Sequence, residues 1–186
     1  MEITLSIFVG VGLAAACGFR IFVPFFVVSV AAMSGHLELA PGFDWMGTHY
    51  ALIAFAAATL LEVVAYYVPW LDNLLDTMAT PAAVAAGIVI TASVVGDLSP
   101  FLRWTLAVIA GGGTAAAVQA STVALRGTSS VTTGGLANPV VSTGELGGSA
   151  VIATLAVVLP VVAVALVIIM GAFLARLRRW SRRSSG

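Results

Sequence analysis

The chain has no lysine, only one cysteine and few charged residues of either sign. Charged residues make up 9% of the 186 residues, whereas about 25% is usual in a soluble domain. The single Cys17 excludes an intrachain disulfide. Because the start of the chain carries Glu2 and lacks a basic segment, we expect no cleaved signal peptide. No hydrophilic segment is long enough for a second domain, so we expect one membrane domain over residues 1–186.

The basic residues are all arginines, and they are unevenly distributed. Five of them lie within residues 176–186, directly after an apolar stretch, whereas only Arg20, Arg103 and Arg126 precede that segment. A basic cluster next to a membrane span is typical of a cytoplasmic anchor and not of a nucleic-acid-binding surface. We therefore expect a basic cytoplasmic tail at 176–186, the lipid bilayer as a partner and no nucleic acid.

Long apolar stretches dominate the rest of the chain and predict an all-α, polytopic membrane helix bundle. A span needs about 20 apolar residues. Thr80 with Pro81, and Ser99 with Pro100, are predicted helix starts, since a hydroxyl side chain caps a helix and proline suits its first position. About five spans result, at 3–33, 50–70, 80–96, 101–125 and 148–175. The termini then lie on opposite sides, with Arg103 on the side of the tail and residues 127–147 outside with the aspartate-bearing turn.

Several positions inside these stretches are predicted to kink or break helices. The first and last stretches are longer than a straight crossing needs. A proline cannot donate to the carbonyl four residues earlier, so Pro24 leaves that of Arg20 free. The glycines of the fourth stretch favour either close helix packing or a broken helix around a site. Kinked spans and re-entrant pairs both remain open. The break candidates are Pro24, Pro69, Gly111, Gly112, Gly113 and Pro160.

Two short segments resemble later ones at an offset of about one hundred residues. Residues 9–16 resemble 109–116, and residues 51–54 resemble 150–153. Three spans separate the copies, and an odd number would invert their orientation, as in transporters built from inverted repeats. A weak inverted repeat with broken or kinked helices is therefore a further hypothesis.

Charged side chains inside the first two apolar stretches predict a buried polar centre. A cation at mid-membrane costs about 2.5–3.5 kcal/mol, so we expect Arg20 to reach Glu62 or an aspartate of residues 72–76. On a single helix, one stripe would contain Glu62, Tyr66, Pro69, Asn73 and Asp76. Asp72 and Asp76 are four residues apart and are the only candidate metal ligands, with the metal unspecified.

A second polar cluster follows the fourth stretch, around a predicted loop of more than twenty residues. Arg126 and Glu145 bracket this loop. His36 and His49 lack the spacing of zinc ligands and are expected to be solvated. Together with the first cluster, the candidate substrate- or ion-binding residues are Arg20, Glu62, Asp72, Asn73, Asp76, Gln119, Arg126, Asn138, Ser142 and Glu145.

The same residues carry a family resemblance that covers nearly the whole chain. The matching pieces are Gly18-Phe-Arg20 with Pro24, then Glu62, Pro69-Trp-Leu-Asp72-Asn73-Leu-Leu-Asp76, Arg126, and Asn138-Pro139 with Ser142. With them the chain resembles domain of unknown function 4126, a family of small bacterial membrane proteins. The resemblance implies the bacterial inner membrane and no established activity. The chain departs from the family at Tyr66 and Tyr67, where an acidic–basic pair is common, and it lacks a lysine before Arg126.

These features together favour a small transporter or channel-like protein, with a homodimer as an open alternative. Arg20 and Arg126 would bind an anionic solute or lipid head group, and Glu62 or an aspartate would take a coupling proton. No cofactor and no catalytic residue is expected. One alternative is a Mg²⁺-dependent intramembrane enzyme that acts on a lipid phosphate through Asp72 and Asp76. Another is a structural membrane subunit without transport activity.

Overall fold

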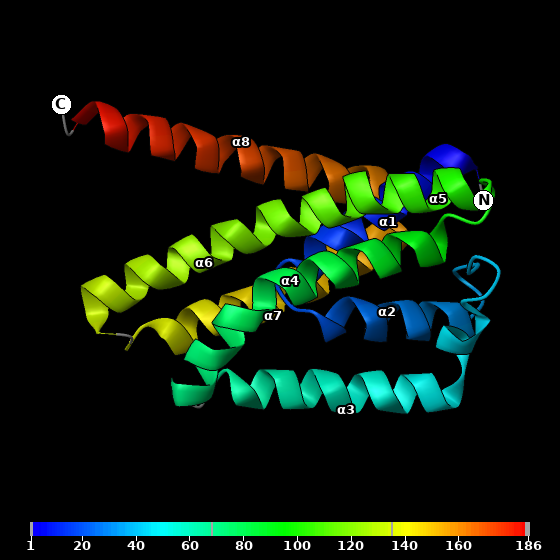
Figure 1. Cartoon of the computed structure of the whole chain (residues 1–186), viewed down its shortest axis with the longest axis horizontal. Helices are drawn as coiled ribbons and strands as arrows, with labels where there is room; N and C mark the ends of the chain where they lie inside the picture. Colours follow the sequence, from blue (N-terminus) through cyan, green and yellow to red (C-terminus); the bar gives the residue numbers. More distant parts are fainter. Residues whose placement is uncertain (1, 68, 135, 185–186) are drawn as a thin grey trace.

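The computed structural model describes residues 2–67, 69–134 and 136–184, without the side chains of 69–77, 174–175 and 177–184. Within these residues the regular structure is all helical, as predicted (Figure 1). The elements are α1 (Ile3–Cys17), α2 (Phe22–Met33), the 3₁₀ turn η1 (Asp44–Gly47), α3 (His49–Ala65), α4 (Pro69–Val94), α5 (Pro100–Leu106), the π-helical η2 (Ala107–Gly112), α6 (Gly113–Thr133), α7 (Asn138–Val158) and α8 (Pro160–Ser184).

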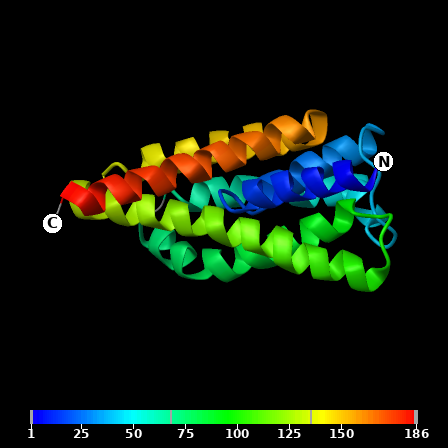
Figure 2. The same cartoon turned by 90° about the horizontal axis from the view of Figure 1, so that it is seen from above.

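The first apolar stretch, predicted at 3–33 as either one kinked span or a pair of helices, is a helical hairpin, which excludes the single kinked span. The chain reverses between α1 and α2, and the turn lies inside the bundle (Figures 1 and 2). Pro24 lies in the first turn of α2. Its ring would clash with the carbonyl of Arg20 in a continuous helix, which explains why α1 does not run on. At 15 and 12 residues, the two helices are about 22 and 18 Å long, which is short of the ~30 Å apolar core of a bilayer.

The predicted span at 148–175 is also two helices that run in opposite directions (Figure 2). Leu159 separates α7 from α8, and Pro160 begins α8, so the break predicted at Pro160 is confirmed. The long loop predicted before this stretch is wrong, because α6 extends to Thr133 and α7 begins at Asn138. Gly134 makes the turn with a φ of 62°, a left-handed conformation that glycine adopts without strain.

Of the two helix starts predicted at a hydroxyl residue followed by proline, one is observed and the other is not. The Oγ of Ser99 accepts a hydrogen bond from the Leu102 N–H at 3.5 Å and caps α5, as predicted. Pro81, by contrast, lies inside α4, which begins at Pro69. The single helix assumed for the Glu62–Asp76 stripe is wrong, because α3 ends at Ala65 and α4 starts at Pro69. Pro69 suits the first position of a helix, because the N–H that proline lacks would be unsatisfied there in any case.

The loops that lie together at each end of the bundle are not those that the sequence predicted to share one side of the membrane. The N-terminus, the α2–α3 connection and α5 lie at one end, and the C-terminus lies at the other with the α3–α4 and α6–α7 connections (Figure 1). Arg103, on α5, is therefore at the end opposite the arginine-rich tail, and the α6–α7 turn is at the same end as the tail. Both segments therefore lie at the end opposite to the predicted one relative to the tail, because the α1–α2 hairpin and the α7–α8 turn add reversals of the chain.

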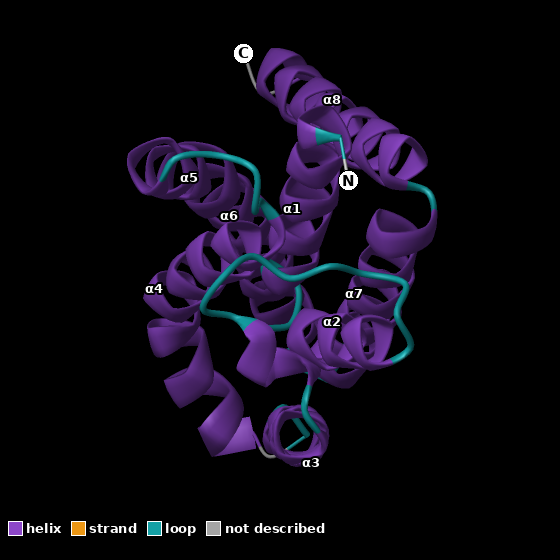
Figure 3. Cartoon of the chain, turned by 90° about the vertical axis from the view of Figure 1, so that its right-hand side faces the viewer, coloured by secondary structure: helices purple, strands orange, loops and turns teal. Residues whose placement is uncertain are grey.

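The short helix α1 lies at the centre of the bundle, with α4, α6, α7 and α8 packed around it (Figure 3). Small side chains allow this packing, and residues 14–17 are fully buried. A Cβ added to Gly18 would stand 2.6 Å from the Val118 Cβ, and one added to Gly12 would stand 2.7 Å from the Ala156 Cβ. The tip of the hairpin is thus held against α6 and α7, the helices that carry the second polar cluster.

The distribution of polarity is the reverse of that in a soluble protein. Ile53, Leu61, Ile109 and Ile168 are between 65% and 70% exposed, while arginine, glutamate, glutamine and serine side chains are buried. An apolar exterior of this extent requires an apolar environment or a partner. Two helical segments of the described chain, Pro100–Thr133 and Asn138–Val158, are long and apolar enough to cross a membrane.

The glycine run at 111–113 does not interrupt the helical backbone. It lies at the junction of η2 and α6, and the six residues of η2 are π-helical. Gly87 of α4 approaches Gly111, so that a Cβ on Gly87 would meet the Gly111 carbonyl oxygen at 2.8 Å. Close helix packing, one of the two predicted explanations, therefore accounts for Gly111. Residues 109–112 are π-helical, whereas residues 9–16, which they partly resemble in sequence, lie within the α-helix α1. The inverted repeat therefore stays a prediction.

We expect Gly111→Ala to destabilise the protein by about 1–3 kcal/mol, the usual effect of overpacking. The added methyl group would stand 2.3 Å from Thr91 Oγ1 and 2.5 Å from the Gly87 carbonyl oxygen. Gly113→Ala is the matched control, because nothing lies within 4 Å of its Cβ position, and alanine should add about 0.5–1 kcal/mol of helix stability. Thermal unfolding in detergent measures both, and equal midpoints for the two variants would contradict the packing.

Candidate functional site

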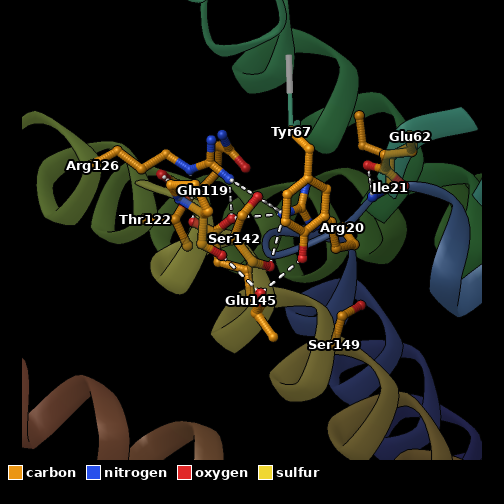
Figure 4. Close-up of polar contacts among 12 residues, drawn as sticks. Arg20, Ile21, Glu62, Tyr67, Gln119, Thr122, Arg126, Ser142, Glu145 and Ser149 are labelled. Carbon is orange, nitrogen blue, oxygen red and sulfur yellow. Dashed lines mark hydrogen bonds and ion pairs between the residues drawn. The ribbon is translucent and has the colours of Figure 1, made fainter. Parts of the chain in front are cut away.

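Arg20 lies at the turn between α1 and α2, and only 2% of its surface is exposed. Its Nη2 donates hydrogen bonds to Ser142 on α7, at 2.9 Å from the carbonyl oxygen and 2.5 Å from Oγ (Figure 4). The break before Pro24 is what places a charged side chain here, since a continuous helix would carry this position past the centre. The guanidinium thus faces protein and not the apolar exterior.

Glu145 is the carboxylate that Arg20 and Arg126 share. Oε2 of Glu145 is 3.3 Å from Arg20 Nη2 and also accepts from Arg126 Nη2. Oε1 accepts from Arg126 Nε at 2.9 Å (Figure 4). The Arg126–Glu145 pair is therefore bidentate, the stronger geometry for this combination, while Arg20 holds the same carboxylate at a longer distance. All three side chains are buried.

Tyr66 stacks on both guanidinium groups and is the main site residue that the sequence selection omitted. Its ring centroid is 3.8 Å from Arg20 Cζ and 4.3 Å from Arg126 Cζ. An aromatic ring attracts cations over its face, by about 2 kcal/mol or more when desolvated. A signal for Tyr66 was present, because it shares the predicted stripe with Glu62 and stands where the family commonly has a charged residue. Its neighbour Tyr67 bonds Thr143 on α7 at 2.8 Å.

Glu62 does not pair with Arg20 within the described structure, and the predicted alternative, an aspartate of residues 72–76, lies outside the described side chains. Its two carboxylate oxygens accept from the backbone N–H groups of Ile21, at 2.8 Å, and Phe22, at 3.0 Å (Figure 4). These amides form the start of α2, whose unsatisfied N–H groups and dipole favour a negative charge. Glu62 therefore fastens α3 to the tip of the hairpin, and Glu145 takes the place predicted for it beside Arg20.

Replacing Glu62 by glutamine should loosen the tip of the hairpin without unfolding the bundle. The amide side chain can accept only one of the two hydrogen bonds and carries no charge. Loss of a hydrogen bond to a charged group costs about 1.5–3 kcal/mol, which corresponds to roughly 10- to 100-fold faster local exchange. Hydrogen exchange read by mass spectrometry on a peptide that contains Ile21 and Phe22 tests this. Exchange at the far end of α2 is the internal control, and unchanged exchange at the tip would contradict the contact.

The remaining candidates fall into two groups. Gln119 and Ser142 are buried on α6 and α7 near the arginines, together with Thr122 and Ser149 (Figure 4). Asn138 is at the start of α7, where its Nδ2 donates to Ser130 Oγ at 3.3 Å. The side chains of Asp72, Asn73 and Asp76 lie outside the described part of the structure, and so does that of Pro69.

Arg20 has more donors than the described residues use. Its Nε and Nη1 are buried and have no hydrogen-bond partner among the residues that the structure describes. An unmet buried donor costs about 1–3 kcal/mol, and more when it is charged, so each such group calls for an explanation. An anion that accepts from these N–H groups would supply one. No group of three or more histidine, cysteine, aspartate and glutamate side chains that could hold a metal occurs among the described residues.

The residues of the site lie within a region of the chain that matches the model of a protein family. The family model described as a domain of unknown function, DUF4126, matches residues 7–180. The chain belongs to the DUF4126 family. The match covers the hairpin, Glu62, both central arginines and Glu145, so the whole centre lies inside the DUF4126 domain. No curated protein and no solved structure matches the chain.

Proposed function

We propose that this DUF4126 protein is a small membrane transporter or channel-like protein that moves an anionic group through the centre formed by Arg20, Arg126 and Glu145. The observation that carries the proposal is the pair of unmet donors on buried Arg20. Arginine presents its N–H groups in a planar fork that suits carboxylate and phosphate oxygens. The large majority of buried polar side-chain atoms have a hydrogen-bond partner, so two unmet donors on one nearly fully buried arginine favour a ligand.

The arrangement suggests how an anion could be coupled to a proton. Glu145 is clamped by Arg126 through both oxygens, whereas its contact with Arg20 is 3.3 Å. An anion can therefore replace Glu145 at Arg20 without breaking the stronger pair. Glu62 is only partly buried and borders a cavity, so it is the carboxyl group that we expect to exchange the proton. Protonation of Glu62 would release the tip of the hairpin, next to the anion.

In the bilayer, we propose that α3, α4, α5 to α6, α7 and α8 cross and that the α1–α2 hairpin enters and returns. The inverted repeat of the sequence analysis remains part of this proposal. Arginines on the cytoplasmic side are the strongest determinant of orientation, so the tail at 176–186 is placed in the cytoplasm of a bacterial cell. The α3–α4 and α6–α7 connections, which lie at the same end as the tail (Figure 1), then face the cytoplasm as well.

Cysteine labelling tests this orientation. With an impermeant thiol reagent on intact cells, Ser99→Cys should be labelled, whereas Ser130→Cys and Ser184→Cys should react only after lysis. Ser99 and Ser130 are exposed on opposite ends of the bundle, and native Cys17 is fully buried and should give no background. Labelling of Ser99→Cys and Ser130→Cys from the same side would contradict the orientation.

Transport itself is tested in proteoliposomes that carry a pH gradient, with radiolabelled acetate, phosphate and sulfate as the anions. We expect gradient-driven accumulation of at least one anion by the wild type. Glu62→Gln should bind the anion but should not accumulate it. Unchanged pH dependence in Glu62→Gln would overturn the coupling. Turnover of a lipid phosphate that depends on Mg²⁺ would favour the enzyme alternative through Asp72 and Asp76 instead.

A further inference from the structure

A cavity of about 410 Å³ lies beside the centre, between the start of α2, the end of α3 and the first half of α4. Its volume is within the range of ligand pockets, about 300–1,000 Å³. The wall is almost entirely apolar and includes Ala58, Leu61, Met78 and Ala82. Such a wall offers nothing to a small hydrated ion, which would lose its hydrogen bonds to water there. The cavity is suited to a hydrocarbon chain.

The cavity lies next to the arginine centre and shares Tyr66 with it. Glu62 and Tyr66 are its polar lining residues, and Tyr66 is the side chain that stacks on Arg20 and Arg126. Tyr66 therefore borders both the apolar cavity and the two guanidinium groups. A molecule with a chain in the cavity would hold its head group beside these cations.

The other lining residues show from which side an occupant would enter. Leu61 and Met78 are 70% and 63% exposed, and both belong to the apolar exterior. In a bilayer, an opening between such residues faces lipid chains. An occupant would therefore arrive laterally from the membrane with its chain already in an apolar environment.

The charges near the cavity determine the sign of the head group. The Glu62 carboxylate already accepts two backbone N–H bonds, whereas Arg20 has two unmet donors. A cationic head group would be repelled by both guanidiniums, while an anionic one could accept from Arg20 in the planar geometry that arginine favours.

We infer that the cavity holds the hydrocarbon chain of an anionic membrane amphiphile, whose phosphate or carboxylate head group binds Arg20. The substrate class of the centre is then a lipid-like anion, and free acetate, phosphate, sulfate or selenate can bind there only as an analogue of its head group. The inference rests on the proposed function, because it assigns a class of substrate to the same site.

Photo-crosslinking from within the membrane tests the inference. The wild type is reconstituted in neutral phosphatidylcholine vesicles with dodecyl phosphate that carries a diazirine in its chain. We expect the label on peptides that contain Leu61 and Met78, and its loss in Ala58→Phe, where the new ring fills the cavity. Ala57→Phe is the matched control, since Ala57 is exposed on the same helix and does not line the cavity. Ala82→Phe, with Ala85→Phe as its control, repeats the test from α4, where both alanines are exposed.

Three further measurements separate the possible failures. Equal labelling by a dodecyl trimethylammonium probe would overturn the inference, because the cavity would then be a groove for any lipid. Arg20-dependent binding of inorganic phosphate without chain labelling would also overturn it, yet would leave the proposed function standing. If acetate, sulfate, inorganic phosphate and the alkyl phosphate all lack binding that is lost in Arg20→Lys, the proposed function itself fails.

Discussion

Replacing Glu145 by glutamine should produce the largest loss of stability of any single substitution in the centre, about 3–5 kcal/mol. The side chain keeps its size, but two buried guanidinium groups lose the carboxylate that they share. Breaking a buried pair is costly because the remaining charge loses its counter-charge, and here both arginines lose a contact with the same carboxylate. The unfolding free energy of the purified protein, measured by denaturant titration in detergent, gives the value.

Asp97→Asn is the matched control for Glu145→Gln. Asp97 is exposed near the start of α5, so the same chemical change should alter stability by less than about 0.5 kcal/mol. If Glu145→Gln were as mild as Asp97→Asn, the two arginines would have to be neutralised by other groups, and the description of Glu145 as the central carboxylate would be wrong.

The second large effect is expected on anion affinity. Arg20→Lys keeps one positive charge at the hairpin tip but removes the planar set of donors, including the unmet Nε and Nη1. Each hydrogen bond between charged groups is worth about 1.5–3 kcal/mol, so the dissociation constant for the transported anion should rise by at least about 10-fold. The bundle should still fold, because lysine can reach Ser142 and Glu145 as a cation.

Arg103→Lys serves as the control for Arg20→Lys. Arg103 also lies over an aromatic ring, with Cζ 5.9 Å from the Phe43 centroid, and Nη1 donates to the Pro41 carbonyl oxygen at 3.5 Å. It is at the end of the bundle opposite the tail and outside the proposed site. Binding isotherms for both variants make the comparison, and equal affinities would show that the planar donors of Arg20 are not used by the anion.

Sequence patterns predicted the helices well but not where the chain reverses. Hydropathy identifies Ile3–Met33 as one apolar stretch because it cannot distinguish a long tilted helix from two short antiparallel ones. Pro24 and Gly18 carry the missing information. However, a proline near an arginine predicts a break in the helix but not the direction of the chain after it. That direction depends on which helices the small residues of α1 pack against. The same holds for Leu159 and Pro160, because a kink in one helix and a reversal between two helices would have similar sequences there.

The sequence predicted most of the residues that form the site but not which acidic residue pairs with which arginine. Arg20, Glu62, Arg126, Ser142 and Glu145 stand out as polar residues in or beside apolar stretches, and the structure brings all of them to the hairpin tip. Which acid meets which arginine depends on helix packing. Glu62 is closer to Arg20 along the chain than Glu145 is. Its oxygens nevertheless accept from backbone N–H groups at the start of α2, which compete with Arg20 for this carboxylate and cannot be located from the sequence.

The central claim is that the arginine centre binds an anion, and anomalous diffraction tests it most directly. Crystals of the purified protein grown with selenate, with data collected at the selenium edge, would locate the anion without reference to function. The account predicts a peak within hydrogen-bond distance of Arg20 Nε and Nη1, lost in Arg20→Lys crystals. Absence of a peak, with both donors bonded to oxygens of the protein itself, would contradict it.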